Sequence, residues 1–234
     1  MNNTTKKNAA VKRPVRKSNK KKSNLWIYIV SILVILLVGG GCFWNFYYTK
    51  TPVYSMHLIQ KAVQEQNLAE FKKHVDTDAM LSRLFDDYSK IALKEFDKTI
   101  SNDPYKTSIE GGFVIGITAV KDKSITYQKE EIYRFVESEK ITDKSSSNYN
   151  YVSSILSMKD KIKDIKCTKR NANIANVVIT IEGISGDLNI NVKMRRLADN
   201  TWQVVEIVNG DDLLYECGVV GFIQVYLKAL GFGN

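Results

Sequence analysis

The stretch DLNINVKMRRLADNTWQVVEIV, Asp187 to Val208, decides the expected fold. Its first half alternates apolar and polar residues, with Leu188, Ile190, Val192 and Met194 on one face and Asn189, Asn191, Lys193 and Arg195 on the other. A period of two is typical of a β-strand that is buried on one face. Ala198-Asp199-Asn200 predicts a turn, and TWQVVEIV alternates again after it. The stretch therefore predicts two antiparallel, half-buried strands.

The residues before Asp187 extend this sheet. IANVVITIEG, residues 174–183, is rich in β-branched residues and follows a predicted turn at residues 171–173. Ile162, Ile165 and Cys167 begin a further strand-like region ahead of that turn. Consecutive strands joined by short turns form an antiparallel meander, whose apolar face needs helices packed against it.

Helical patterns occupy the chain before the sheet. Apolar residues recur at helical spacing over residues 58–63, 80–96 and 126–139, and Asn67 followed by Glu70 has the spacing of a capping box. GGFVIGITAV, residues 111–120, fits either a short helix or a buried strand, and this choice stays open. The apolar segment from Cys217 to Gly233 predicts a helix that packs on the core or lies on a surface. Residues 51–234 are therefore expected to form one α+β domain of several helices on an antiparallel meander sheet.

The positive charge of the chain is concentrated in its first 24 residues. Nine of the 34 Lys and Arg residues precede Leu25, with no acid among them, which leaves 25 bases against 25 acids in the remainder. Such a tail lacks the apolar residues needed to fold, so residues 1–24 are expected to be disordered. Bases beside a membrane span are retained on the cytoplasmic side, and we favour this interpretation over a nucleic-acid partner.

A long uncharged run follows the tail. No charged residue occurs between Leu25 and Phe43, and aromatic residues flank the run at Trp26, Tyr28, Trp44 and Tyr47. About 20 apolar residues span the hydrocarbon core, and aromatic rings favour the interface at either end. We therefore expect residues 25–48 to be an uncleaved signal-anchor helix in the cell membrane, with the N-terminus cytoplasmic and residues 51–234 extracytoplasmic. A lipoprotein modified at Cys42 is the alternative at this end of the chain.

The chain shows no recognisable catalytic or cofactor motif. Its two histidines, His57 and His74, lack metal-ligand spacing to another His or Cys, so no catalytic, cofactor-binding or metal site is predicted. His74 and Asp76 are the nearest candidates for an acid/base pair. An exported domain permits a disulfide between Cys167 and Cys217, whereas the apolar face that Cys167 shares with Ile165 favours a buried thiol.

Two segments resemble a family of bacterial membrane-anchored proteins, catalogued as domain of unknown function 2939. AVQEQNLAEFKKHVDTDAMLSRL, residues 62–84, resembles the family's opening, in which a short helix and an NLAxFxxxVD turn lead into a second helix. NANIANVVITIEG and VKMRRLADNTWQVVEIVNG resemble its closing hairpins, with a Trp-x-Val-Val strand that ends in Asn. The resemblance implies a helix-plus-curved-sheet fold of the cystatin-like or NTF2-like kind. It implies no catalytic residues, because the family has no established activity.

These observations predict a single-pass, non-enzymatic membrane protein that presents a binding domain to a protein or envelope ligand. Trp202 and the aromatic-rich C-terminal segment would line its groove, or else pack in the core. The alternative is an envelope enzyme on an NTF2-like fold that uses His74 with Asp76. A deep polar cavity with two convergent titratable groups would favour the enzyme, and a filled apolar cavity would favour the binding domain.

Overall fold

The structure is a computed structural model that describes residues 25–138, 161–183 and 186–232, so the predicted disordered tail lies outside the described residues. It forms two compact units, Met1–Cys42 and Phe43–Asn234. Helix α1, Leu25–Phe46, continues through the three glycines and Cys42. Within the described part of the chain, one helical stretch, Ile29–Lys50, is long and apolar enough to cross a membrane, and none of it is buried.

The second unit begins with a short 3-10 helix and two short helices. These are η1 (Tyr48–Lys50), α2 (Pro52–Gln64) and α3 (Leu68–His74), and the longer helix α4 (Thr77–Thr99) follows. The Asn67 carboxamide oxygen accepts a hydrogen bond of 3.0 Å from the Glu70 amide and starts α3, as the capping spacing predicts. Asp76 caps α4 in the same way, with 3.2 Å to the Ala79 amide.

Helix α5, Lys106–Ser138, settles the open assignment of residues 111–120, which are helical. It joins that segment and the predicted helix at 126–139 into one element of 33 residues. Each glycine inside a helix costs about 1 kcal/mol relative to Ala, so packing has to hold Gly111, Gly112 and Gly116 in place. The Phe113 ring supplies such packing, because it stacks on Phe96 of α4 with ring centroids 4.0 Å apart.

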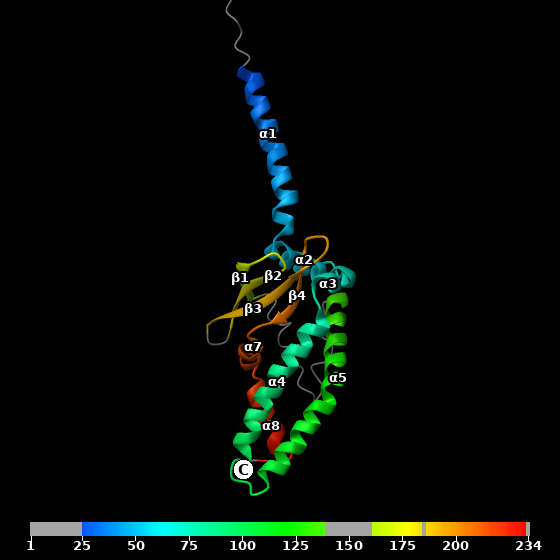
Figure 1. Ribbon diagram of the computed structural model, residues 1–234, viewed down its shortest axis with the longest axis vertical. Coiled ribbons are helices and arrows are strands. Elements are labelled where there is room, and N and C mark those ends of the chain that lie inside the picture. The colour runs from blue at the N-terminus through cyan, green and yellow to red at the C-terminus, as the bar shows by residue number, and fades with distance from the viewer. Residues whose placement is uncertain (1–24, 139–160, 184–185, 233–234) are drawn as a thin grey trace, which may run out of the picture. The chain divides into compact units, whose positions relative to one another are not determined.

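The sheet has four antiparallel strands in the order β1-β2-β3-β4, joined as a meander (Figure 1). They are β1 (Ile162–Arg170), β2 (Ile174–Glu182), β3 (Asp187–Arg196) and β4 (Trp202–Ile207). On β3 the apolar side chains Ile190, Val192 and Met194 are buried, whereas Asn189 and Arg195 are exposed, which confirms the alternation. Two short helices, α7 (Gly210–Glu216) and α8 (Val219–Ala229), follow the sheet. The predicted α+β class is therefore confirmed.

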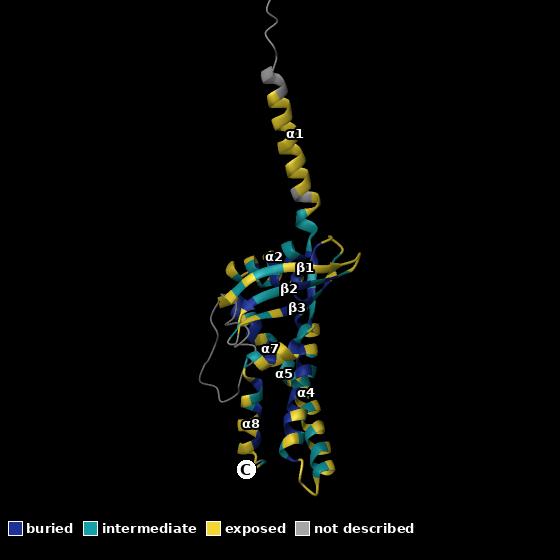
Figure 2. Cartoon of the chain, turned by 90° about the vertical axis from the view of Figure 1, so that its left-hand side faces the viewer, coloured by how far each residue is buried: buried dark blue, intermediate teal, exposed yellow. Residues whose placement is uncertain are grey.

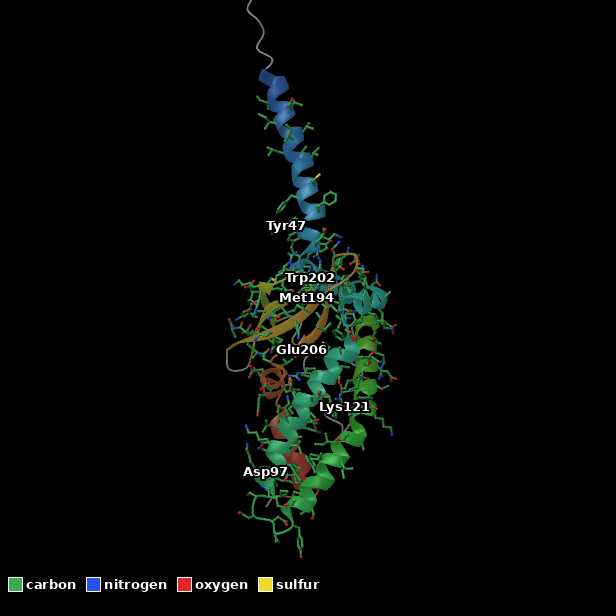
Figure 3. All side chains as sticks on the ribbon, viewed as in Figure 1. Tyr47, Asp97, Lys121, Met194, Trp202 and Glu206 are labelled. Atoms are coloured by element: carbon green, nitrogen blue, oxygen red, sulfur yellow. The ribbon has the colours of Figure 1, made fainter. Side chains whose placement is uncertain are left out.

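The core lies between the buried face of the sheet and the helices. Helices α2, α3 and α4 all pack against β4. Buried residues lie on the sides of the helices and strands that face one another (Figure 2). Figure 3 places Trp202 and Met194 among the strands and Lys121 on the long helix α5. The backbone amide of Asp76 donates to the Val204 carbonyl over 2.8 Å, so the junction between α3 and α4 is tied to the last strand.

The turn between β3 and β4 is organised by Asp199. Its carboxylate accepts hydrogen bonds from the Thr201 hydroxyl at 2.5 Å and the Thr201 amide at 2.9 Å, and it pairs with Lys73 at 2.9 Å. The Thr201 hydroxyl and the Lys73 ammonium hold the pKa of Asp199 well below its ordinary value, against the opposing effect of partial burial. The turn is therefore linked to α3 through an ionised carboxylate.

We expect Asp199→Asn to lower the free energy of unfolding at pH 7 by less than about 1 kcal/mol, because the Asp199 side chain is 44% exposed and water screens the pair. A lowered carboxyl pKa contributes stability above its unfolded value, which is lost as the pH falls through the folded one. The difference between wild type and variant should thus shrink between pH 4 and pH 3, close to the ordinary Asp pKa of about 3.9. Urea denaturation at pH 7, 4 and 3 measures it, and a difference that stays constant would contradict this assignment.

Candidate functional site

A groove lies along α4 in the second unit, between the flanking helices α5 and α8. Helix α4 packs against both of these helices, and the three run side by side below the sheet (Figure 1). The groove encloses about 870 Å³, within the roughly 300–1,000 Å³ typical of sites for one small molecule. We call it the α4–α5–α8 groove. Its lining consists of Phe85, Tyr88, Ala92, Gly112, Phe113, Gly116, Ile117, Val120, Lys123, Ser124, Tyr127, Gln128, Phe222, Ile223, Tyr226, Leu227 and Leu230.

Most of this lining is apolar or aromatic, and part of it faces solvent. Val120, Tyr226 and Leu230 are each about half exposed although they line the groove. Apolar surface left open in a concave site is typical of a binding site, because a ligand can remove it from water. The groove therefore has the surface that an apolar ligand would bury.

Two glycines of α5 keep the groove open. Gly112 and Gly116 both line it, and a Cβ atom added to either would meet nothing within 4 Å. Gly111, the neighbouring glycine, also has open space around it but lies outside the lining. The helix thus offers two positions where a side chain would enter the groove and one matched position where it would not.

Polar groups gather at one end of the groove. Lys123, Ser124, Tyr127 and Gln128 all come from the last part of the α5 lining. The Gln128 side chain is buried, with a residue exposure of 5%, and its amide oxygen has no hydrogen-bond partner among the described residues. A buried acceptor without a partner is rare in folded proteins and marks a place for a missing donor.

The charged groups around this end differ in their pairing. Lys121 binds Asp86 at 2.6 Å and Lys129 binds Asp78 at 2.7 Å, so both lysines clamp α5 to α4. Lys123 lies between them in sequence and lines the groove, and the described part of the chain provides no ion pair for it. Among the described residues it is the one charged side chain of the lining, and none of the others is Asp, Glu, His or Cys.

Tyr88 lines the groove with a largely buried hydroxyl. Burial raises the pKa of Tyr88 above its ordinary value, and the nearby Tyr226 raises it further. The rings of Tyr88 and Tyr226 both line the groove and can pack against an apolar ligand. Among the described residues, no carboxylate or imidazole lines the groove, so its described lining is mainly apolar and aromatic.

His74 and Asp76, the acid/base pair of the enzyme alternative, make structural contacts between the α3–α4 junction and the sheet. His74 is fully buried, and its Nδ1 donates to the Trp202 carbonyl at 2.8 Å, while Nε2 lies 3.0 Å from a Glu70 carboxylate oxygen. The Asp76 carboxylate caps α4 and contacts Arg195 at 3.3 Å. Neither residue lines the groove, because both join the α3–α4 junction to the sheet.

Of the two places expected for Trp202, the structure shows the core, and Trp202 does not line the groove. Its side chain is 0% exposed, and its indole N–H donates to the Lys50 carbonyl over 3.0 Å. Trp202 lies at the start of β4 with its side chain on the buried face of the sheet, so it packs in the core. The C-terminal segment, the other candidate for the groove, does line it, since Phe222, Tyr226 and Leu230 belong to α8 and its end.

The cysteines also differ from one expectation. Cys167 is exposed on the edge strand β1 and makes a weak contact with the Lys169 carbonyl at 3.8 Å, so a buried Cys167 beside Ile165 is wrong. The structure forms no disulfide between Cys167 and Cys217. Cys217 is partly buried at the end of α7, and burial raises the pKa of its thiol to about 11.

Of the four predicted interfacial residues, only the Tyr47 side chain is described. It is 60% exposed and stacks on Phe43 with ring centroids 5.1 Å apart. The side chains of Trp26, Tyr28 and Trp44 lie outside the described residues. Among the residues that the structure does describe, no group of three His, Cys, Asp or Glu side chains is arranged to hold a metal ion.

Comparison with protein-family models, curated proteins and solved structures found no match. The resemblance to the membrane-anchored family, and the cystatin-like or NTF2-like assignment that it implies, therefore stay predictions. The groove itself was missed by sequence reasoning, except for its C-terminal wall. The signal that would have found its other wall is the helical stripe Phe113, Ile117, Ser124 and Gln128, which is interrupted by glycines on the same helix.

Proposed function

We propose that this chain is a single-pass membrane-anchored protein whose non-catalytic extracytoplasmic domain, residues 51–234, binds an apolar ligand in the α4–α5–α8 groove. The observation that carries the proposal is the open apolar lining, whose described residues include no carboxylate or imidazole for acid/base chemistry. The ligand would be another protein or a component of the cell envelope. Its binding is favoured because it removes this lining from water, at about 25 cal/mol per Å² of apolar surface.

The anchoring part of the proposal is supported by α1 and by the charge ahead of it. An apolar helical stretch of 22 residues, Ile29–Lys50, has the length that a bilayer requires. The nine bases before Leu25 favour a cytoplasmic N-terminus, since Lys and Arg are retained on that side. Residues after the span would then face the outside of the cell.

The cysteines provide a test of this orientation. In intact cells, a membrane-impermeant maleimide should label the exposed thiol of Cys167, and Cys167→Ser should remove nearly all of the label. Cys217 should contribute little, because a pKa of about 11 instead of 9.0 leaves about 100-fold less reactive thiolate. Labelling of Cys167 only after the cells are lysed would place the domain in the cytoplasm and contradict the proposed orientation.

The binding part is tested with a neutral apolar dye, N-phenyl-1-naphthylamine, whose fluorescence rises when it leaves water. The full chain in phosphatidylcholine nanodiscs should give a saturable increase above that of empty nanodiscs at equal lipid concentration. One dye per chain is expected from a groove of about 870 Å³. An increase that only follows the lipid concentration would contradict binding by the domain.

A further inference from the structure

The α4–α5–α8 groove is amphipathic along its length. The first part of the α5 lining, Gly112 to Val120, carries only apolar residues and glycines, and the polar residues lie beyond it at Lys123, Ser124 and Gln128. At 1.5 Å per residue the apolar part is about 12 Å long. One leaflet of a bilayer, half of the roughly 30 Å core, is of similar length. The apolar part therefore matches one acyl chain in length.

Aromatic contacts identify the two ends. Phe113 meets Phe96 at the apolar end, and Phe96 also contacts Phe232 edge-on, with ring centroids 5.2 Å apart. At the other end, Phe85 lies 6.0 Å from the ammonium of Lys121, in the region where α5 is clamped to α4. A ligand with one apolar and one polar end would therefore have one preferred direction in the groove.

The polar end provides two different binding groups. Lys123 is a cation in the lining for which the described chain holds no counter-ion, so an anionic group of the ligand would be attracted there. The Gln128 amide oxygen is buried without a donor, and the terminal torsion of Gln has a broad energy profile through which the amide can turn toward the groove. A ligand hydroxyl would satisfy this acceptor.

We propose, on the basis of the proposed function, that the groove binds a lysophospholipid, which has a single acyl chain, an anionic phosphate and a free hydroxyl. The acyl chain lies along Gly112 to Val120, the phosphate pairs with Lys123, and a hydroxyl donates to the Gln128 amide oxygen. The volume of about 870 Å³ suits one chain, whereas a phospholipid with two chains would leave one of them outside.

The test is mass spectrometry of the full chain released intact from non-ionic detergent micelles, titrated with three lipids of equal chain length. These are lysophosphatidylglycerol, the neutral monoacylglycerol and two-chain phosphatidylglycerol. We expect one lysophosphatidylglycerol per chain, bound about tenfold more tightly than monoacylglycerol, since a charge-assisted contact contributes roughly that factor. Two-chain phosphatidylglycerol should bind no more tightly than monoacylglycerol.

Three substitutions assign the binding groups. Lys123→Gln should remove the preference for lysophosphatidylglycerol, and Lys94→Gln, an exposed lysine of α4 outside the lining, should leave it unchanged. Gln128→Leu should weaken both single-chain lipids about fivefold, because both carry a hydroxyl and one hydrogen bond is lost. Thermal unfolding confirms that each variant is folded, and Gln128→Leu should not be destabilised because it removes a buried amide oxygen without a partner among the described residues.

The possible outcomes distinguish failure of the lysophospholipid proposal from failure of the proposed function. Equal affinity for lysophosphatidylglycerol and monoacylglycerol, a preference that survives Lys123→Gln, or equally tight binding of two-chain phosphatidylglycerol would each overturn the lysophospholipid proposal. If Gly116→Leu nevertheless weakens binding of the apolar dye as expected, the proposed function stands without that ligand. If Gly116→Leu changes neither dye nor lipid binding, the proposed function fails as well.

Discussion

Replacing Trp202 with Ala is expected to lower the free energy of unfolding of the second unit by about 3–5 kcal/mol, the usual range for a buried Trp or Phe. Trp202 is fully buried where α2, α3 and β4 meet. Its loss would leave a cavity and would also leave the Lys50 carbonyl without the indole donor. Guanidinium titration of the full chain in non-ionic detergent, followed by circular dichroism, measures the change.

Trp202→Phe is the matched control, since it keeps an aromatic ring but removes the indole N–H. We expect this variant to lose about 1–2 kcal/mol, from one buried hydrogen bond and a smaller volume. In both variants, dye binding under native conditions should keep the wild-type dissociation constant, because Trp202 does not line the groove. A Trp202→Ala variant that is as stable as the wild type but binds dye weakly would restore Trp202 as a groove residue.

The sheet could be predicted from the sequence because each of its signals is local. The alternation on β3 depends only on residues 188–195, and the turn at Asp199 lies directly after them. The start of α3 is equally local, since Asn67 caps an amide three residues away. Local patterns of this kind predict the folded structure correctly when packing in the core favours the same secondary structure.

The exposure of Cys167 and the groove could not be predicted, because both depend on partners distant in sequence. Cys167 pairs with the fully buried Val177 of β2 but is exposed, because β1 is at the edge of the described sheet. The groove brings Phe85, Gly116 and Tyr226 together from three helices, and no spacing within one helix indicates the distance to its neighbours. For the same reason, the sequence could not decide between helix and strand for residues 111–120. Packing against Phe96 of α4 supports a helix that the glycines of this segment disfavour.

Gly116→Leu is expected to raise stability while it weakens binding in the groove. Any residue with better helix propensity than Gly in an exposed helix position adds about 0.5–1 kcal/mol to the free energy of unfolding. Gly116 is exposed, and its Cβ would meet no atom within 4 Å, so no clash offsets this gain. The Leu side chain would fill space that a ligand needs. If the ligand loses burial of two methylene groups at about 0.8 kcal/mol each, its affinity falls at least about tenfold.

The dissociation constant of N-phenyl-1-naphthylamine for the wild type, Gly116→Leu and Gly111→Leu therefore tests most directly whether the α4–α5–α8 groove is the binding site. Gly111 is a glycine of the same helix with equally open surroundings, but it lies outside the lining. The groove predicts that Gly116→Leu raises the dissociation constant at least about tenfold, that Gly111→Leu leaves it unchanged, and that both variants unfold at higher temperature than the wild type. Equal dissociation constants for all three chains would contradict it.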